Sequence, residues 1–391
     1  MIDTYWYGIK VEAGANNNKE YEMKVEPAGS TFTARWGRVG TTGQTKVFPV
    51  STWEKTIRTR LEHGYKDMTG VKVTSAGGSF KMLDGSIGAV VAALRASAGA
   101  SVSANYAGAE NVTQAQIEAA QRILDRLGMM NGKATVRQIN EGLVELWQTL
   151  PRKMRSVAAE LLEPTSRPHD IQAKLQYEQA LTDQLAGQVA TAVQPTANDQ
   201  TILDAIGVAM REATPAERAQ VLALFEAESQ PKVGRIWRVV NKKTQAAFDA
   251  WKPSSKQALL FHGSRTPNWW GIVTQGLSIR PSSTNGSALG RGNYFANWAD
   301  KSIGYTSLDG SRWGHGSDLV AFMAVFVVKL GTVLKVTDYV HDGHNRARRG
   351  EFDTCHAVAP KNPVSWPRRD EITTYDNAQS TIAYLVELVA K

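Results

Sequence analysis

Apolar and polar residues alternate along the first fifty positions of the chain, as they do in strands that bury one face. One such run covers residues 21–25 and another covers residues 32–36, and Gly29 and Gly40 follow them. This period of two predicts a small antiparallel sheet near the N-terminus.

The middle of the chain shows instead the three-to-four-residue apolar spacing of amphipathic helices. From Thr113 onward, the apolar positions within residues 117–127 and 136–150 each fall on one helical face, and Pro151 ends the second stretch. Further prolines punctuate the chain up to about position 215. We expect several helices packed as a bundle.

Short apolar runs separated by Gly, Asn, Ser and Asp return after about position 221. They occur at residues 236–240, 258–261 and 321–330, and the chain closes with two more at 371–375 and 380–388. The pattern predicts a β-rich C-terminal domain.

Between positions 75 and 109 the sequence is rich in Ala, Gly and Ser, with one apolar patch at residues 90–94. Such a composition is typical of a flexible linker. The fold class is therefore α+β multidomain. We expect a small antiparallel β domain at 1–84, a linker at 85–112, a helical domain at 113–215 and a β-rich domain at 216–391.

Composition narrows the class of protein. Hydrophobic residues make up 42% and charged residues 21% of the 391 positions, which fits a globular chain with several cores. We see no secretion signal and no run that approaches a membrane span, so we expect an intracellular protein without a membrane partner. The single Cys355 excludes an internal disulfide and a zinc cluster. A net charge of +8 favours polyanionic partners without identifying one.

Candidate chemistry gathers in the C-terminal domain. Residues 259–265 end a predicted strand with His-Gly-Ser-Arg, and three further segments follow at 290–296, 301–305 and 370–376. A lone histidine at a strand end is usually structural, and a glutamate such as Glu371 is usually a solvated strand residue. The chemical interpretation rests on the segments taken together.

Together these segments resemble the catalytic domain of the poly(ADP-ribose) polymerase family, whose His-Gly-Ser-Arg, Gly-Lys-Gly-Ile-Tyr-Phe-Ala and Asn-Glu-Tyr-Ile-Val-Tyr-Asp motifs occur in that order. The spacing makes the resemblance specific, because Ser302 and Tyr305 lie 8 and 11 positions after Tyr294 as their counterparts do. It implies a catalytic triad of His262, Tyr294 and Glu371, with NAD⁺ as substrate and no metal.

The resemblance also implies a nicotinamide clamp made of the Gly263 backbone, the Ser302 hydroxyl and the Tyr305 ring. These groups suit the ligand, because nicotinamide presents a flat ring and a carboxamide with one acceptor and two donor hydrogens. Ser264 and Asn268 match positions on the adenosine side of the family's NAD⁺ site.

Two catalytic roles follow from the same resemblance. Glu371 would stabilise the oxocarbenium-like ribose, hold its 2′-hydroxyl and polarise the acceptor, while His262 would bind the adenosine ribose. Ser278 stands where many members carry an arginine, which leaves the pyrophosphate contacts open.

Near the N-terminus, Arg35-Trp36-Gly37-Arg38-Val39-Gly40 and the following Gly43 to Lys46 resemble the WGR domain, over roughly residues 3–70. In this family the domain binds nucleic-acid ends. An exposed Trp36 would stack on a sugar or base while Arg38 and Lys46 neutralise phosphate, although an isolated strand tryptophan is more often part of a core. The helical middle occupies the position of the family's regulatory domain.

The favoured function is an NAD⁺-dependent ADP-ribosyltransferase that forms poly(ADP-ribose) and is stimulated by DNA ends or nicks. Its acceptor would be another protein or the enzyme itself, and its compartment the nucleus of a eukaryote or the cytoplasm of a bacterium. Two alternatives stay open. One is mono-ADP-ribosylation, which the short segment of seventeen residues between Asp353 and Glu371 favours, and the other is a catalytically silent nucleic-acid-binding scaffold.

Overall fold

The structure is a computed structural model of the chain. It describes residues 4–69, 80–108, 112–192, 195–197, 199–281, 288–360 and 366–390. Two compact units are present. The first comprises Met1–Ala76 with Ala100–Leu185, and the second comprises Gly77–Gly99 with Ala186–Lys391.

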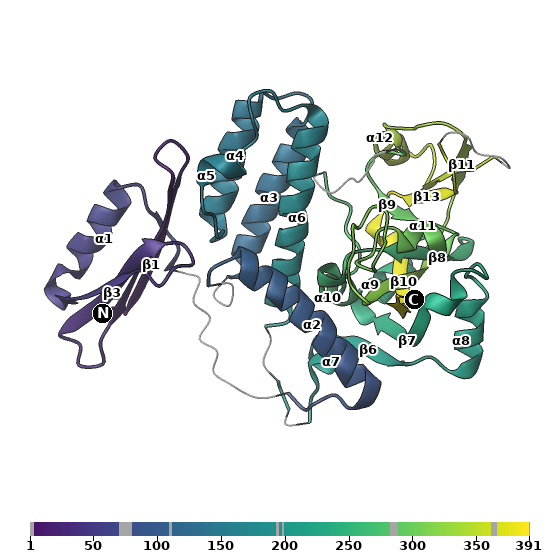
Figure 1. Ribbon diagram of the computed structural model, residues 1–391, viewed down its shortest axis with the longest axis horizontal. Coiled ribbons are helices and arrows are strands. Elements are labelled where there is room, and N and C mark those ends of the chain that lie inside the picture. Colours follow the sequence, from purple (N-terminus) through teal and green to yellow (C-terminus); the bar gives the residue numbers. More distant parts are fainter. Residues whose placement is uncertain are drawn as a thin grey trace. The chain divides into compact units, whose positions relative to one another are not determined.

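A five-stranded antiparallel sheet of order β4-β3-β2-β1-β5 opens the first unit (Figure 1). Its strands are β1 (Tyr5–Glu12), β2 (Asn17–Val25), β3 (Thr31–Arg38), β4 (Gln44–Pro49) and β5 (Lys66–Asp67). Helix α1 (Trp53–Glu62) buries Trp53 edge-on against Phe32 of β3, with ring centroids 5.1 Å apart. The alternating runs at 21–25 and 32–36 are β2 and β3, so the predicted sheet is confirmed.

Helices follow the sheet in the first unit, and α3, α4 and α6 run side by side in Figure 1. They are α3 (Gln114–Met130), α4 (Val136–Thr149), α5 (Val157–Glu160) and α6 (Pro168–Ala190). Capping boxes begin α3 at Thr113 and α4 at Thr135. In each box the threonine side chain accepts a hydrogen bond from the backbone amide of the glutamine three residues later, and the side chain of that glutamine accepts one from the threonine amide. The predicted helical middle is confirmed.

Residues expected to form a flexible linker are helical instead. Helix α2 covers Gly85–Asn105, and its residues Val90, Val91 and Leu94 are buried in the core of the second unit. The apolar patch lies on one helical face, and burial of that face stabilises the helix. The Ala, Gly and Ser content of the segment made a flexible linker the expected structure. By length and composition α2 also meets the criterion for a membrane span, contrary to our expectation, but a helix from a protein core passes the same test.

Two sheets form the second unit. Five antiparallel strands have the order β6-β7-β14-β10-β8. Four shorter strands have the order β11-β12-β13-β9, in which β11 and β12 are parallel and the other pairs are antiparallel. The larger sheet contains β6 (Val208–Glu212), β7 (Val233–Asn241), β8 (Gln257–Gly263), β10 (Val320–Lys329) and β14 (Ser380–Val389). The smaller sheet contains β9 (Asn293–Phe295), β11 (Val333–Val336), β12 (Thr354–Ala357) and β13 (Glu371–Thr374).

Short helices pack around these sheets. They are α7 (Ile202–Ala205), α8 (Pro215–Leu222), α9 (Lys242–Ala250), α10 (Trp269–Gln275), α11 (Ala299–Ile303) and α12 (Gly343–Arg348). Strand β6 lies within the stretch expected to be helical up to position 215, yet it pairs with β7 in the larger sheet. The β-rich C-terminal domain is confirmed, and its sheet begins earlier in the chain than the apolar runs indicate.

Candidate active site and nucleic-acid interface

The two sheets of the second unit meet where strands β8 and β9 touch. Phe261 and Ala296 exchange two backbone hydrogen bonds, of 2.8 and 3.0 Å. Directly beside this bridge, His262 Nδ1 lies 3.0 Å from the Tyr294 carbonyl oxygen. The fold therefore brings together two segments that are 32 positions apart in the sequence.

His262 is enclosed by aromatic rings, with Trp269, Phe295 and Phe326 at centroid distances of 6.3, 5.9 and 5.9 Å. This burial lowers the pKa of His262, so its ring is neutral at neutral pH. A carbonyl oxygen only accepts hydrogen bonds, so the proton sits on Nδ1 facing Tyr294. The Nε2 atom is then a hydrogen-bond acceptor.

The Tyr294 hydroxyl holds the segment that precedes β9. It donates to the Gly290 carbonyl oxygen at 2.6 Å and accepts from the Leu289 backbone amide at 3.0 Å. Tyr375 adds a second anchor, because its hydroxyl donates to the Leu289 carbonyl oxygen at 2.5 Å. Burial raises the pKa of the Tyr294 hydroxyl, which stays protonated and able to donate.

Glu371 is the first residue of β13, two positions before the Thr373 that pairs with Tyr294 of β9. Burial raises the pKa of both Tyr294 and Tyr305, and the charge of Glu371 acts in the same direction. Lys301 Nζ lies 2.5 Å from Glu371 Oε1, and both side chains are largely buried. The carboxylate is thus held by a cation inside the site.

Sequence reasoning missed Lys301 and Glu226, which orient this part of the site. Burial lowers the pKa of Lys301, and the Glu371 charge opposes that shift. Glu226 Oε1 accepts a hydrogen bond from the Ala299 amide at 2.9 Å and so anchors the start of α11, which carries Lys301 and Ser302. Lys301 lies inside a matched motif, but the sequence has no signal for Glu226.

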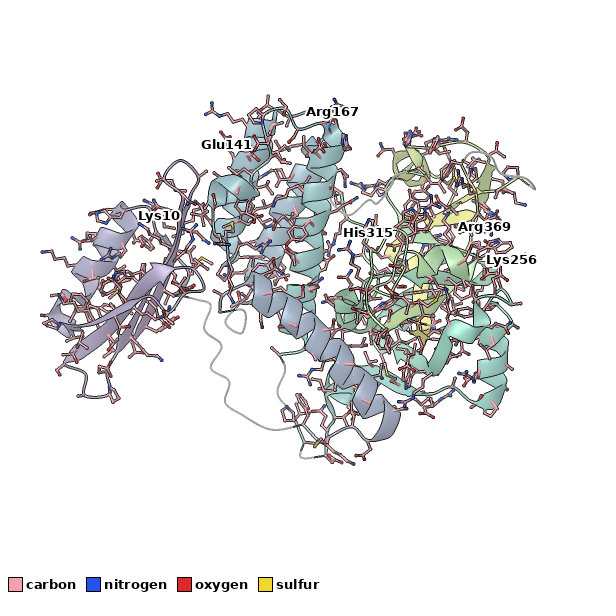
Figure 2. The ribbon with its side chains drawn as sticks, in the orientation of Figure 1. Lys10, Glu141, Arg167, Lys256, His315 and Arg369 are labelled. Atoms are coloured by element: carbon pink, nitrogen blue, oxygen red, sulfur yellow. The ribbon has the colours of Figure 1, made fainter. Side chains whose placement is uncertain are left out.

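The segment leading into Glu371 is fixed on its outer side. Arg369, labelled in Figure 2, lies with its guanidinium 4.4 Å from the Trp298 ring centroid. Asp370 Oδ2 lies 2.8 Å from His356 Nε2, and Asp370 Oδ1 accepts from the Ala359 amide at 2.9 Å. These contacts hold the backbone immediately before Glu371.

The three residues of the nicotinamide clamp come together. Gly263 lies against Ser302 so closely that a Cβ atom at position 263 would meet the Ser302 carbonyl oxygen. Ser302 is buried in α11, and its carbonyl oxygen accepts from the Tyr305 amide at 3.1 Å. The Tyr305 ring stacks on Trp313, at a centroid distance of 4.8 Å.

The two residues expected on the adenosine side are also neighbours. Asn268 Nδ2 donates to Ser264 Oγ at 2.9 Å, and Trp269 Nε1 donates to the Ser264 carbonyl oxygen at 3.0 Å. Ser264 follows directly on the clamp residue Gly263, so this pair lies at the end of β8.

In the N-terminal sheet, Trp36 is half-buried and stacks on Tyr21, with centroids 5.7 Å apart and planes 17° apart. Tyr65 meets Tyr21 edge-on, and the Arg60 guanidinium lies 4.1 Å from the centroid of the Tyr21 ring. Lys46 is exposed. Trp36 is therefore the outer part of an aromatic cluster, and Arg60 is a basic neighbour that sequence reasoning missed.

The Arg38 side chain makes hydrogen bonds to two other segments of the first unit. Its Nε donates to the Met154 carbonyl oxygen at 2.8 Å, and its Nη atoms donate to Asn16 at 3.2 Å. Asn18 Nδ2 likewise donates to the Arg152 carbonyl oxygen at 2.9 Å. Within the first unit, Arg38 links the sheet to the segment that follows α4.

Comparison with known families agrees with this geometry. The sequence model of the poly(ADP-ribose) polymerase catalytic domain matches residues 217–354, and that of the WGR domain matches residues 7–66. The chain belongs to the poly(ADP-ribose) polymerase family. It is an NAD⁺ ADP-ribosyltransferase with an N-terminal WGR domain. Glu371 lies beyond the matched residues, so its assignment rests on its motif and on the contacts described above.

Viral and plant proteins are among the relatives. The chain is 32% identical over 192 residues to the uncharacterized protein 101L of Invertebrate iridescent virus 6, covering 48% of this chain and 80% of that protein. It is 25% identical over 171 residues to the putative poly [ADP-ribose] polymerase-like 100L of the same virus, covering 39% of this chain and 84% of that protein. It is 27% identical over 207 residues to poly [ADP-ribose] polymerase 2-A of Oryza sativa subsp. japonica, covering 47% of this chain and 30% of that protein.

Proposed function

We propose that this transferase forms poly(ADP-ribose) at the site of His262, Tyr294 and Glu371, and that nucleic-acid ends stimulate it through the WGR domain. The observation that carries the catalytic part is the position of Glu371. Its carboxylate is held by Lys301 at 2.5 Å, and its strand β13 pairs with β9, which carries Tyr294.

The proposed reaction exchanges one bond at the ribose C1′ atom for another. The bond from C1′ to nicotinamide breaks, its electron pair leaves with neutral nicotinamide, and the ribose gains oxocarbenium character. The Glu371 carboxylate stabilises this positive charge, since an oriented charge in a desolvated site acts strongly. The acceptor then bonds to C1′ and loses a proton, and Glu371 polarises it for the attack.

The other side chains orient NAD⁺ in this proposal. The nicotinamide clamp receives the ring and the carboxamide. His262 accepts a hydrogen bond from an adenosine ribose hydroxyl at Nε2, because its Nδ1 proton is committed to the Tyr294 carbonyl oxygen. Ser264 and Asn268 contact the adenosine side.

Polymer formation is favoured over mono-ADP-ribosylation because a glutamate is present at position 371 to polarise a ribose hydroxyl of a growing chain. The seventeen residues between Asp353 and Glu371 favour the alternative, because a short segment offers less surface to hold such a chain. The acceptor in either case is a protein or the enzyme itself. Product length separates the two reactions.

The nucleic-acid part of the proposal rests on the WGR match and on the Trp36 cluster. Trp36 and the exposed Lys46 would contact a DNA end or nick, with Arg60 as a further cation. Arg38 would couple this binding to the helical region through its bond to the Met154 carbonyl oxygen. An enzyme of this kind would work inside the cell, where DNA is present.

The test is to incubate the full chain with labelled NAD⁺, with and without nicked DNA, and to separate the products by size. Ladders of modified protein that lengthen with nicked DNA support the proposal. Single additions indicate the mono-ADP-ribosylating alternative, and no consumption of NAD⁺ by the intact chain contradicts the assigned site.

A further inference from the structure

Trp313 lies in the segment between α11 and β10, and no motif of the active site includes it. Its side chain is 43% exposed, yet its ring stacks nearly parallel on Tyr305 at 4.8 Å and 25°. Tyr305 itself is half-buried and follows α11 directly after Gly304. A surface ring therefore covers one face of a ring in the candidate active site.

The segment that carries Trp313 is held by its own backbone. The amides of Trp313 and Gly314 both donate to the Gly304 carbonyl oxygen at 2.8 Å, and Ser311 Oγ donates to the Thr306 carbonyl oxygen at 2.8 Å. A Cβ atom on Gly314 would lie 1.9 Å from the Thr306 carbonyl oxygen. Such close approach is possible only for glycine, and it fixes the indole in place.

The indole is in turn confined from two sides. A Cβ atom on Gly304, the residue before Tyr305, would lie 2.6 Å from the Trp313 ring. The Arg312 guanidinium lies 5.4 Å from the centroid of the same ring. Trp313 is thus fixed against Tyr305 rather than merely exposed near it.

We propose that Trp313 is a positioning residue that backs Tyr305 on one face of its ring, so that nicotinamide on the other face adds a third layer to the stack. This inference rests on the proposed NAD⁺ site. Contact with Trp313 holds the Tyr305 ring in one rotamer, so the ligand does not have to immobilise it. Parallel offset stacking also favours the third ring.

Binding of benzamide, which copies the nicotinamide ring and carboxamide, tests this role directly. Trp313→Ala should weaken benzamide binding roughly two- to tenfold, the range that loss of one aromatic partner implies. The KM for NAD⁺ should rise by a similar factor while kcat changes less, and Tyr305→Ala should be at least as severe. Trp313→Phe keeps a stacking ring and should restore most of the affinity, a rescue that a general loss of folding would not give.

A matched control is Tyr339→Ala, because Tyr339 is 51% exposed and stacks on Trp366 at 4.4 Å without any assigned role. It should leave benzamide binding unchanged. Unchanged binding in Trp313→Ala overturns the inference, and so does tighter binding, which would place the indole where nicotinamide belongs. If the wild type itself binds no benzamide and consumes no NAD⁺, the proposed function fails and the inference fails with it.

Discussion

Gly263 lies so close to the backbone of Ser302 that a Cβ atom added to it would sit 1.8 Å from the Ser302 carbonyl oxygen. The end of β8 and the helix α11 therefore meet without a side chain between them. Both residues belong to the proposed nicotinamide clamp. Their contact explains in physical terms why the first motif requires glycine after its histidine.

Replacing Gly263 with Ala should separate β8 from α11 and displace Ser302. We expect kcat/KM for NAD⁺ to fall on the order of tenfold to hundredfold, because small misplacements of binding groups have large kinetic effects. Steady-state kinetics measures the change. Gly14→Ala is the matched control, since a Cβ atom there meets nothing within 4 Å and should leave the kinetics unchanged.

Replacing Glu371 with Gln should keep the shape of the site and remove its negative charge. Turnover should fall about a hundredfold or more, as expected when one oriented electrostatic group is removed from a transition state. Benzamide binding should persist, which distinguishes lost chemistry from lost structure. Glu351→Gln, a surface carboxylate paired with Arg346 and Arg349, serves as the control. Near-normal turnover of Glu371→Gln would contradict the assigned role.

Much of this site was predictable because its residues lie in short contiguous motifs. Strand and helix patterns follow local spacing, so β2, β3, α3 and α4 match the apolar periodicity. Helix α2 was not predictable from composition, because Ala, Gly and Ser are typical both of linkers and of helices that pack closely. The burial of its residues Val90, Val91 and Leu94 depends on long-range contacts within the second unit.

Pairings between distant segments were also beyond sequence reasoning. Lys301 and Glu371 are 70 positions apart, and only the pairing of β9 with β13 brings them together. Arg38 is likewise predicted as a phosphate ligand because it adjoins Trp36, and its hydrogen-bond partner Met154 lies 116 positions away. A local motif identifies candidate residues, but the contacts that each residue makes depend on the fold.

A buried lysine supplies a prediction about stability. Lys329 of β10 is almost fully buried, and its Nζ donates to the carbonyl oxygens of Phe248 and Trp251, both at 2.6 Å, at the end of α9. Lys329→Met would leave these acceptors unsatisfied, so the free energy of unfolding should fall by about 2–4 kcal/mol. Urea denaturation measures this difference. Lys335→Met, on the exposed side of β11, should change stability by less than about 0.5 kcal/mol.

The lowered pKa of His262 gives a pH dependence with a definite sign. Between pH 6.5 and its lower folded-state pKa, the unfolded chain binds a proton at this histidine that the folded chain does not. Stability must then fall as pH falls through that window, by at most about 1.4 kcal/mol per pH unit for one group. His344, whose pKa is also lowered, acts in the same direction.

Measuring the free energy of unfolding at pH 7.5, 6.5 and 5.5 checks this effect. His262→Gln should show a shallower loss of stability on acidification than the wild type, and His344→Gln should retain the His262 contribution. Equal slopes in the wild type and His262→Gln would show that the imidazole does not resist protonation in the folded state.

Trp36 provides the test of nucleic-acid control. Its ring stacks on Tyr21, so Trp36→Ala removes the outer ring of the cluster while the buried Tyr21 remains beneath it. We expect this variant to lose most stimulation by nicked duplex and to retain basal NAD⁺ turnover. The reason is that Trp36 lies in the WGR domain, whereas the proposed catalytic residues lie in the other unit. If phosphate contacts by groups such as Lys46 carry the binding, stimulation of the wild type should weaken steeply with salt, since each released counterion adds to the slope. Linkage adds a reciprocal requirement: a DNA end that favours the active state must itself bind more tightly when benzamide is present.

Turnover is measured with nicked duplex, intact circular duplex and single-stranded RNA, each at low and high salt, alongside DNA binding with and without benzamide. Identical rates under all these conditions would exclude control by nucleic acid, and equal loss of basal and stimulated activity in Trp36→Ala would show that the residue supports folding instead.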